Sequence, residues 1–165
     1  MSIPLVRLTS AALLSITLAG CGPATDDKAN ARNATEYGIW SSTTLEHLPP
    51  DDARLFQQAQ QEIKLSIMAH SAATGSEAID QEFLAKVDGL TAHQLMILGL
   101  QDRLQRLQSE HDEAKQLYDQ NSKLITRNAA SAAVLASRVN EDKQRVDKSD
   151  AQLAATRADL DRIKK

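Results

Sequence analysis

Residues that interrupt helices and residues that build large cores are both scarce in this chain of 165 amino acids. It contains 6 Gly, 4 Pro, 1 Cys and only 3% aromatic residues. The single cysteine excludes an internal disulfide, and the low aromatic content leaves few large side chains for a core. No glycine or proline occurs from Gln101 to Lys165. The second half therefore lacks the usual signals that end a helix, and we predict a long helix there.

A strong charge of one sign is also missing, since 19 basic and 22 acidic residues give a net charge of −3. Nucleic-acid-binding domains usually carry a basic footprint, so we expect no nucleic-acid partner. The four histidines are His47, His70, His93 and His111. No two of them have metal-ligand spacing on one helix face, and the chain has no second cysteine that could act as a further ligand. The sequence predicts neither a metal site nor a cofactor.

Catalytic motifs are absent as well. The chain has no nucleophile elbow and no glycine-rich phosphate loop. A cell-wall hydrolase, the enzyme class weighed as an alternative, needs an acid and a base in a cleft. The carboxylates here fall on helix faces that we expect to be exposed, so we predict no catalytic residues and no enzyme.

The first 20 residues have the pattern of a secretory signal. Arg7 supplies a weakly basic start, and Ala11 to Ala19 are mostly apolar. This stretch is shorter than the roughly 20 apolar residues of a membrane-spanning helix, and small residues follow it. We predict a signal peptide over residues 1–20 with cleavage between Gly20 and Cys21.

The residues Leu18, Ala19, Gly20 and Cys21 resemble the lipobox of bacterial lipoproteins. The resemblance implies that Cys21 carries a diacylglyceryl group on its sulfur and an acyl chain such as palmitate on its new amino group. Two or more acyl chains give stable membrane attachment. Because Gly22 rather than aspartate follows the cysteine, the resemblance implies an outer-membrane location facing the periplasm.

The remaining chain divides into three predicted segments. Residues 21–48 are polar, rich in small residues and without a sustained period, which predicts a lipidated flexible tether spanning roughly 30 Å. Its patch from Tyr37 to Trp40 is interpreted as a loop docked on the helices, or alternatively as a recognition segment. Residues 49–128 are predicted to form a small helical bundle and residues 129–165 an extended C-terminal helix.

Helical periodicity supports the bundle. An apolar stripe including Phe56, Ile63 and Ile67 predicts a first helix after two prolines, and a second is expected from Ser76 to Asp88 with Gly89 as its cap. Thr91 and Gln94 have capping-box spacing at the start of a third. The fold class is therefore all-α, a small helical bundle or hairpin leading into a long amphipathic, coiled-coil-like C-terminal helix.

A seven-residue apolar repeat runs from Ile97 to Ile163 without a change of phase. Such a repeat predicts a left-handed coiled coil, and a continuous helix from Thr91 onward would be roughly 110 Å long at about 1.5 Å per residue. The alternative left open is a helix folded back near Thr126–Ala133. The candidate seam for a partner, either an envelope protein or a second copy, consists of Ile125, Leu135, Val139, Val146, Leu153 and Leu160.

The charged C-terminus resembles that of the murein lipoprotein, a lipidated coiled coil whose terminal lysine is joined to peptidoglycan. Lys165 occupies the matching position. The function expected from the sequence is a non-enzymatic, lipid-anchored tethering protein of the cell envelope. The alternatives are a structural spacer linked to peptidoglycan through Lys165 and an accessory lipoprotein of a secretion or conjugation machine.

Overall fold

Every regular element in the computed structural model is an α-helix, within the residues that it describes, 26–72, 75–126 and 128–165. The expected all-α class is confirmed. The helices are α1 (Ala34–His47), α2 (Pro50–His70), α3 (Ser76–Val87), α4 (Ala92–Asn121) and α5 (Ala129–Ile163).

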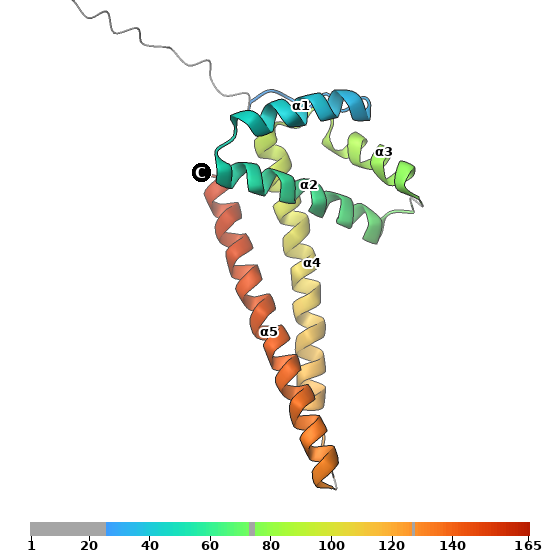
Figure 1. Ribbon diagram of the computed structural model, residues 1–165, viewed down its shortest axis with the longest axis vertical. Helices are drawn as coiled ribbons and strands as arrows, with labels where there is room; N and C mark the ends of the chain where they lie inside the picture. Colours follow the sequence, from blue (N-terminus) through green and yellow to red (C-terminus); the bar gives the residue numbers. More distant parts are fainter. Residues whose placement is uncertain (1–25, 73–74, 127) are drawn as a thin grey trace, which may run out of the picture.

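The helices form a compact body with a protruding hairpin (Figure 1). Helices α1, α2 and α3 gather around the N-terminal half of α4, while α5 runs back along α4 in the opposite direction. The far ends of α4 and α5 extend well beyond the other three helices (Figure 1).

Local sequence signals account for several helix boundaries. The predicted capping box of α4 is present, since Thr91 Oγ1 accepts from the Gln94 amide at 3.2 Å and Gln94 Oε1 accepts from the Thr91 amide at 3.0 Å. Gly89 follows α3 with a φ of 74°, the left-handed conformation that favours glycine at a helix end. Pro50 begins α2, where its missing N–H costs nothing.

The predicted flexible tether over residues 21–48 is wrong for most of its length. Residues 34–47 form α1, which buries Tyr37, Ser41 and Thr44 against the body. The ring of Tyr37 packs edge-on to Phe83 with centroids 5.3 Å apart, so the aromatic patch docks on the helices as expected, although as a helix and not as a loop. The sequence pattern did not predict α1, because two of the three buried residues on its inner face are polar.

The core lies where α2 crosses α4. Leu55, Phe56 and Ile63 of α2 are fully buried, as is Leu95 of α4. Leu160 and Ile163, from the end of α5, belong to the same cluster. The expected division into a bundle over 49–128 and a separate extended helix over 129–165 therefore fails, because the end of α5 completes the core of the bundle.

The sequence left open whether the helix from Thr91 is continuous or folds back, and the structure shows two helices. Helix α4 ends at Asn121, and α5 begins at Ala129 after a short connection. Asn128 caps the new helix, its Oδ1 accepting from the Ser131 amide at 2.8 Å. The alternative of a chain folded back near Thr126–Ala133 is thus confirmed. The heptad faces of α4 and α5 now lie on each other within one chain.

Candidate interaction site

The predicted partner seam is largely covered by the chain itself. Leu153 and Leu160 are buried, and Leu135, Val139 and Val146 are half-buried. Ile125 alone is free, at 94% exposure in the connection between α4 and α5. Five of the six seam residues are therefore at least partly covered within the hairpin, and Ile125 is exposed in the connection.

The polar residues of the seam satisfy one another or their own backbone. Asn121 Nδ2 donates to Asp142 Oδ2 at 2.7 Å, which joins α4 to α5 next to the tip. The hydroxyls of Ser149 and Thr156 donate to carbonyls one turn earlier, at 2.9 and 2.8 Å. These three α5 residues are buried, so the seam tolerates polar residues by pairing them.

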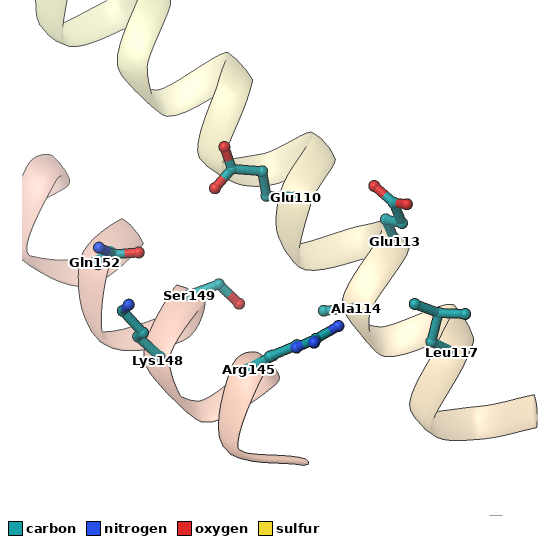
Figure 2. Close-up of a pocket in the computed structure, with 8 residues that line it drawn as sticks. All are labelled: Glu110, Glu113, Ala114, Leu117, Arg145, Lys148, Ser149 and Gln152. Carbon is teal, nitrogen blue, oxygen red and sulfur yellow. The ribbon is translucent and has the colours of Figure 1, made fainter. Parts of the chain in front are cut away.

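Figure 2 shows a groove of about 310 Å³ on the side of the hairpin. Glu110 and Glu113 line it from α4, and Arg145, Lys148 and Gln152 line it from α5. Its walls carry opposite charges, and its buried floor includes the small side chains Ala114 and Ser149. Glu110 is already paired with Arg106 at 2.6 Å. The opposite charges on the two walls favour packing of α5 against α4.

A second cavity, of about 240 Å³, lies between α2 and α4. Buried Glu62 accepts two hydrogen bonds there from Arg106, at 2.9 and 2.7 Å, and Arg103 lies 4.0 Å away. The hydrogen bond with Glu62 raises the pKa of the Arg106 guanidinium above its ordinary value. This bidentate pair ties the two helices together.

The histidines make local or hairpin contacts. His111 lies 3.1 Å from Asp150 of α5 and 3.2 Å from Asp112, and its hydrogen bond lowers the pKa of the Asp112 carboxyl. His47 and His70 each hydrogen-bond a carbonyl one turn earlier, at 2.7 and 3.0 Å. In the described ranges, no three His, Cys, Asp or Glu residues are grouped to hold a metal ion.

The tip of the hairpin, defined here as residues 122–140, exposes three large apolar side chains. Leu124, Ile125 and Val134 are 58%, 94% and 66% exposed. The tip contains no acidic residue, although the whole chain has 22. Its three basic residues are Lys123, Arg127 and Arg138. The predicted seam included Ile125, Leu135 and Val139 of this range but neither Leu124 nor Val134, and the absence of a carboxylate between Asp119 and Glu141 was visible in the sequence.

The predicted lipidation and cleavage residues, Cys21 and Gly20, lie outside the described residues. The described chain begins with a strap, residues 26–33, that docks on the start of α4. Ala29 donates to the Leu90 carbonyl at 2.7 Å and accepts from the Gly89 amide at 2.9 Å, and the Ala31 amide donates to Asp88 Oδ1 at 2.8 Å.

The predicted peptidoglycan attachment residue, Lys165, is exposed two residues after the end of α5. The end of that helix is held to the body, since Ile163 is buried and Arg162 pairs with Asp52 of α2 at 2.7 Å.

No family model, no curated protein and no solved structure matches the chain. None of the described helices combines the length and apolar character needed to cross a membrane.

Proposed function

We propose that this protein is a lipid-anchored, non-enzymatic tethering protein of the cell envelope, attached through Cys21 and facing the periplasm. Its hairpin presents an apolar, basic tip to a second component of the envelope. The observation that carries the proposal is the exposure of Ile125 at the end of a hairpin whose seam is otherwise covered. Large exposed apolar residues gathered on one surface are typical of interaction sites.

The strap supports an anchored arrangement. Asp27, whose carbonyl oxygen accepts from Trp40 Nε1 of α1 at 3.2 Å, lies six positions after Cys21. An extended chain of that length reaches roughly 20 Å. A lipid on Cys21 would therefore keep the body close to the membrane surface.

The strap and the tip lie at opposite ends of α4. The strap pairs with residues next to Thr91, where α4 starts, and the tip follows its last residue. A helix of 30 residues is about 45 Å long at ~1.5 Å per residue. The hairpin thus holds the tip well away from the strap, which supports a tethering role.

The anchor is tested by growing Gram-negative cells that express the full chain with an alkynyl palmitate analogue. We expect the wild-type chain to be labelled and its mature form to begin at Cys21 by mass spectrometry. Cys21→Ser should abolish the label, whereas Gly22→Ser, which places the same residue one position away, should retain it. Equal labelling of Cys21→Ser and wild type would refute lipidation at this cysteine.

The tip is tested in the same cells with a photoreactive residue at position 125. We expect position 125 to form a cross-linked adduct with a second component of the envelope. Position 68 is the control and should form none: Met68 is also exposed, but it lies on α2 and not at the tip. Adducts of similar yield from both positions would show that the tip has no special role in contact.

A further inference from the structure

We infer that the tip of the hairpin inserts into an anionic phospholipid surface, with Leu124 and Ile125 entering the headgroup region and the exposed Lys123 and Arg138 contacting phosphates. This inference rests on the proposed function in taking the tip as the interaction end, and it names the chemistry of the partner. It adds a second membrane contact that is independent of the lipid on Cys21.

The position of the apolar residues suits lipid. Leu124 and Ile125 lie in the connection between two helices, at the end of a protruding hairpin (Figure 1). Both side chains are exposed at this end of the molecule, at 58% and 94%. Shallow insertion of such side chains, by about 5–10 Å, is how interfacial segments bind membranes.

The charge of the tip is complementary to anionic lipid. Lys123 and Arg138 are exposed on either side of the apolar residues, and Arg127 lies between them in sequence. No carboxylate occurs from Gln120 to Asn140 to repel a phosphate. Basic residues next to an apolar segment add electrostatic attraction to membranes that contain anionic lipids.

A protein partner fits this surface less well. A stable protein interface covers about 800 Å² on each side, and the heptad face that would provide such an area is covered within the hairpin. The hollow beside Val134 is lined by residues of α5 alone, so it is not a cleft between elements that would receive a partner's side chain. A fluid lipid surface, in contrast, accommodates a small convex tip.

Sedimentation with vesicles tests the inference on residues 22–165 prepared without lipid. All members of the described core lie between Ala31 and Ile163, so this form retains the packing of the body. The vesicles are phosphatidylcholine alone, or an equal mixture with phosphatidylglycerol. We expect binding to the mixed vesicles, little to the neutral ones, and weaker binding in high salt because charge screening removes the attraction.

Two double variants locate the binding surface. Leu124→Glu with Ile125→Glu should raise the lipid concentration for half binding at least tenfold. Ile39→Glu with Met68→Glu adds the same charge at residues that are 65% and 61% exposed on α1 and α2, and it should change binding less than twofold. Lys123→Gln with Arg138→Gln should weaken binding to the mixed vesicles and leave the residual binding to neutral vesicles unchanged.

Circular dichroism establishes that each variant is folded before binding is measured. The inference is overturned if folded wild-type protein ignores mixed vesicles, if it binds both vesicles equally, or if the two glutamate variants weaken binding alike. A tip variant that converts a wild-type oligomer to a monomer, without loss of vesicle binding, would assign the tip to a second copy instead. Palmitate labelling of Cys21 is measured independently, so failure of one proposal is distinguishable from failure of the other.

Discussion

At the scale of single residues, one glycine sets the distance between α2 and α4. A Cβ atom added to Gly99 would lie 2.4 Å from the Cα atom of Ala59 and 2.5 Å from its carbonyl oxygen. The glycine is therefore required for space and not for an unusual φ. Its backbone contact allows the fully buried side chains on either side, Phe56 and Ile63, to enter the core.

We expect Gly99→Ala to lower the free energy of unfolding by about 1–3 kcal/mol, because overpacking against backbone forces the helices apart. Gly38→Ala is the matched control, since Gly38 is exposed on α1 and a Cβ there meets nothing within 4 Å. The greater helix propensity of alanine should raise the free energy of unfolding of Gly38→Ala by roughly 0.5–1 kcal/mol above that of the wild type. Urea denaturation measures the free energy of unfolding of both variants. A Gly99→Ala variant as stable as the wild type would contradict the close contact between the two helices.

The ion pair between Glu62 and Arg106 leads to a second expectation. Arg106→Met leaves a buried carboxylate without its bidentate partner, and breaking a fully buried pair costs roughly 3–5 kcal/mol. The loss here should be nearer 2 kcal/mol, because Arg106 is partly exposed and Arg103 stays 4.0 Å from Glu62.

Adding Glu62→Leu to Arg106→Met should recover most of that stability in the same urea experiment. The double variant no longer buries a carboxylate at position 62, and leucine fills the space with apolar atoms. If the single and double variants were equally unstable, lost packing and not the orphaned carboxylate would be the cause.

At the scale of elements, the arrangement of α4 and α5 decides what the heptad repeat does. Glu113 and Lys148 line the same groove in Figure 2. In a continuous helix, the 35 positions between them would place them about 52 Å apart at ~1.5 Å per residue. Only the hairpin brings the two side chains near each other in one chain.

We expect a zero-length carbodiimide cross-link between Lys148 and Glu113 or Glu110, at a yield that does not depend on protein concentration. Mixing ¹⁵N-labelled and unlabelled chains should give cross-linked peptides of uniform isotope content, because each link forms within one chain. Peptides of mixed isotope content would instead indicate that α5 packs on α4 of a second copy.

The polar layer next to the tip sets the register of this hairpin. We expect Asn121→Leu to cost about 1–3 kcal/mol, because Asp142 is then buried without its donor. Asn121→Leu with Asp142→Leu should be at least as stable as wild type by thermal denaturation. A single variant that melts like the wild type would show that Asp142 finds water or another donor.

At the scale of the whole molecule, the strap couples the predicted anchor to the body. Asp88→Ala removes the acceptor of the buried Ala31 amide. We expect hydrogen exchange at the Ala31 amide to accelerate at least tenfold, because the freed donor must be solvated. Asp26→Ala, an exposed change in the same strap, should leave that rate unchanged.

Release of the strap would also change the reach of the anchor. The free link would lengthen from the six residues before Asp27 to the 13 residues before α1, or about 45 Å when extended. Unaltered exchange at Ala31 in Asp88→Ala would show that the backbone bonds of Ala29 hold the strap without the carboxylate.

Local signals in the sequence determined a large part of this architecture. The apolar stripe of α2, the capping box at Thr91 and the glycine after α3 act through neighbouring residues, so they could be recognised without a fold. The same holds for the heptad repeat, because its spacing depends only on helix geometry. The helix α1 escaped recognition since its buried face includes Ser41 and Thr44, which are polar by composition and buried only by context.

Only the tertiary structure decided what covers the heptad face and which residues remain exposed. A seven-residue repeat requires a partner face but does not specify whose. The connection after Asn121 has no glycine or proline, so its one local signal was the cap at Asn128. A short connection keeps α5 at high effective concentration beside α4. Its end also buries Leu160 and Ile163 in the core, and so the face closes within the chain and Ile125 is left at the tip.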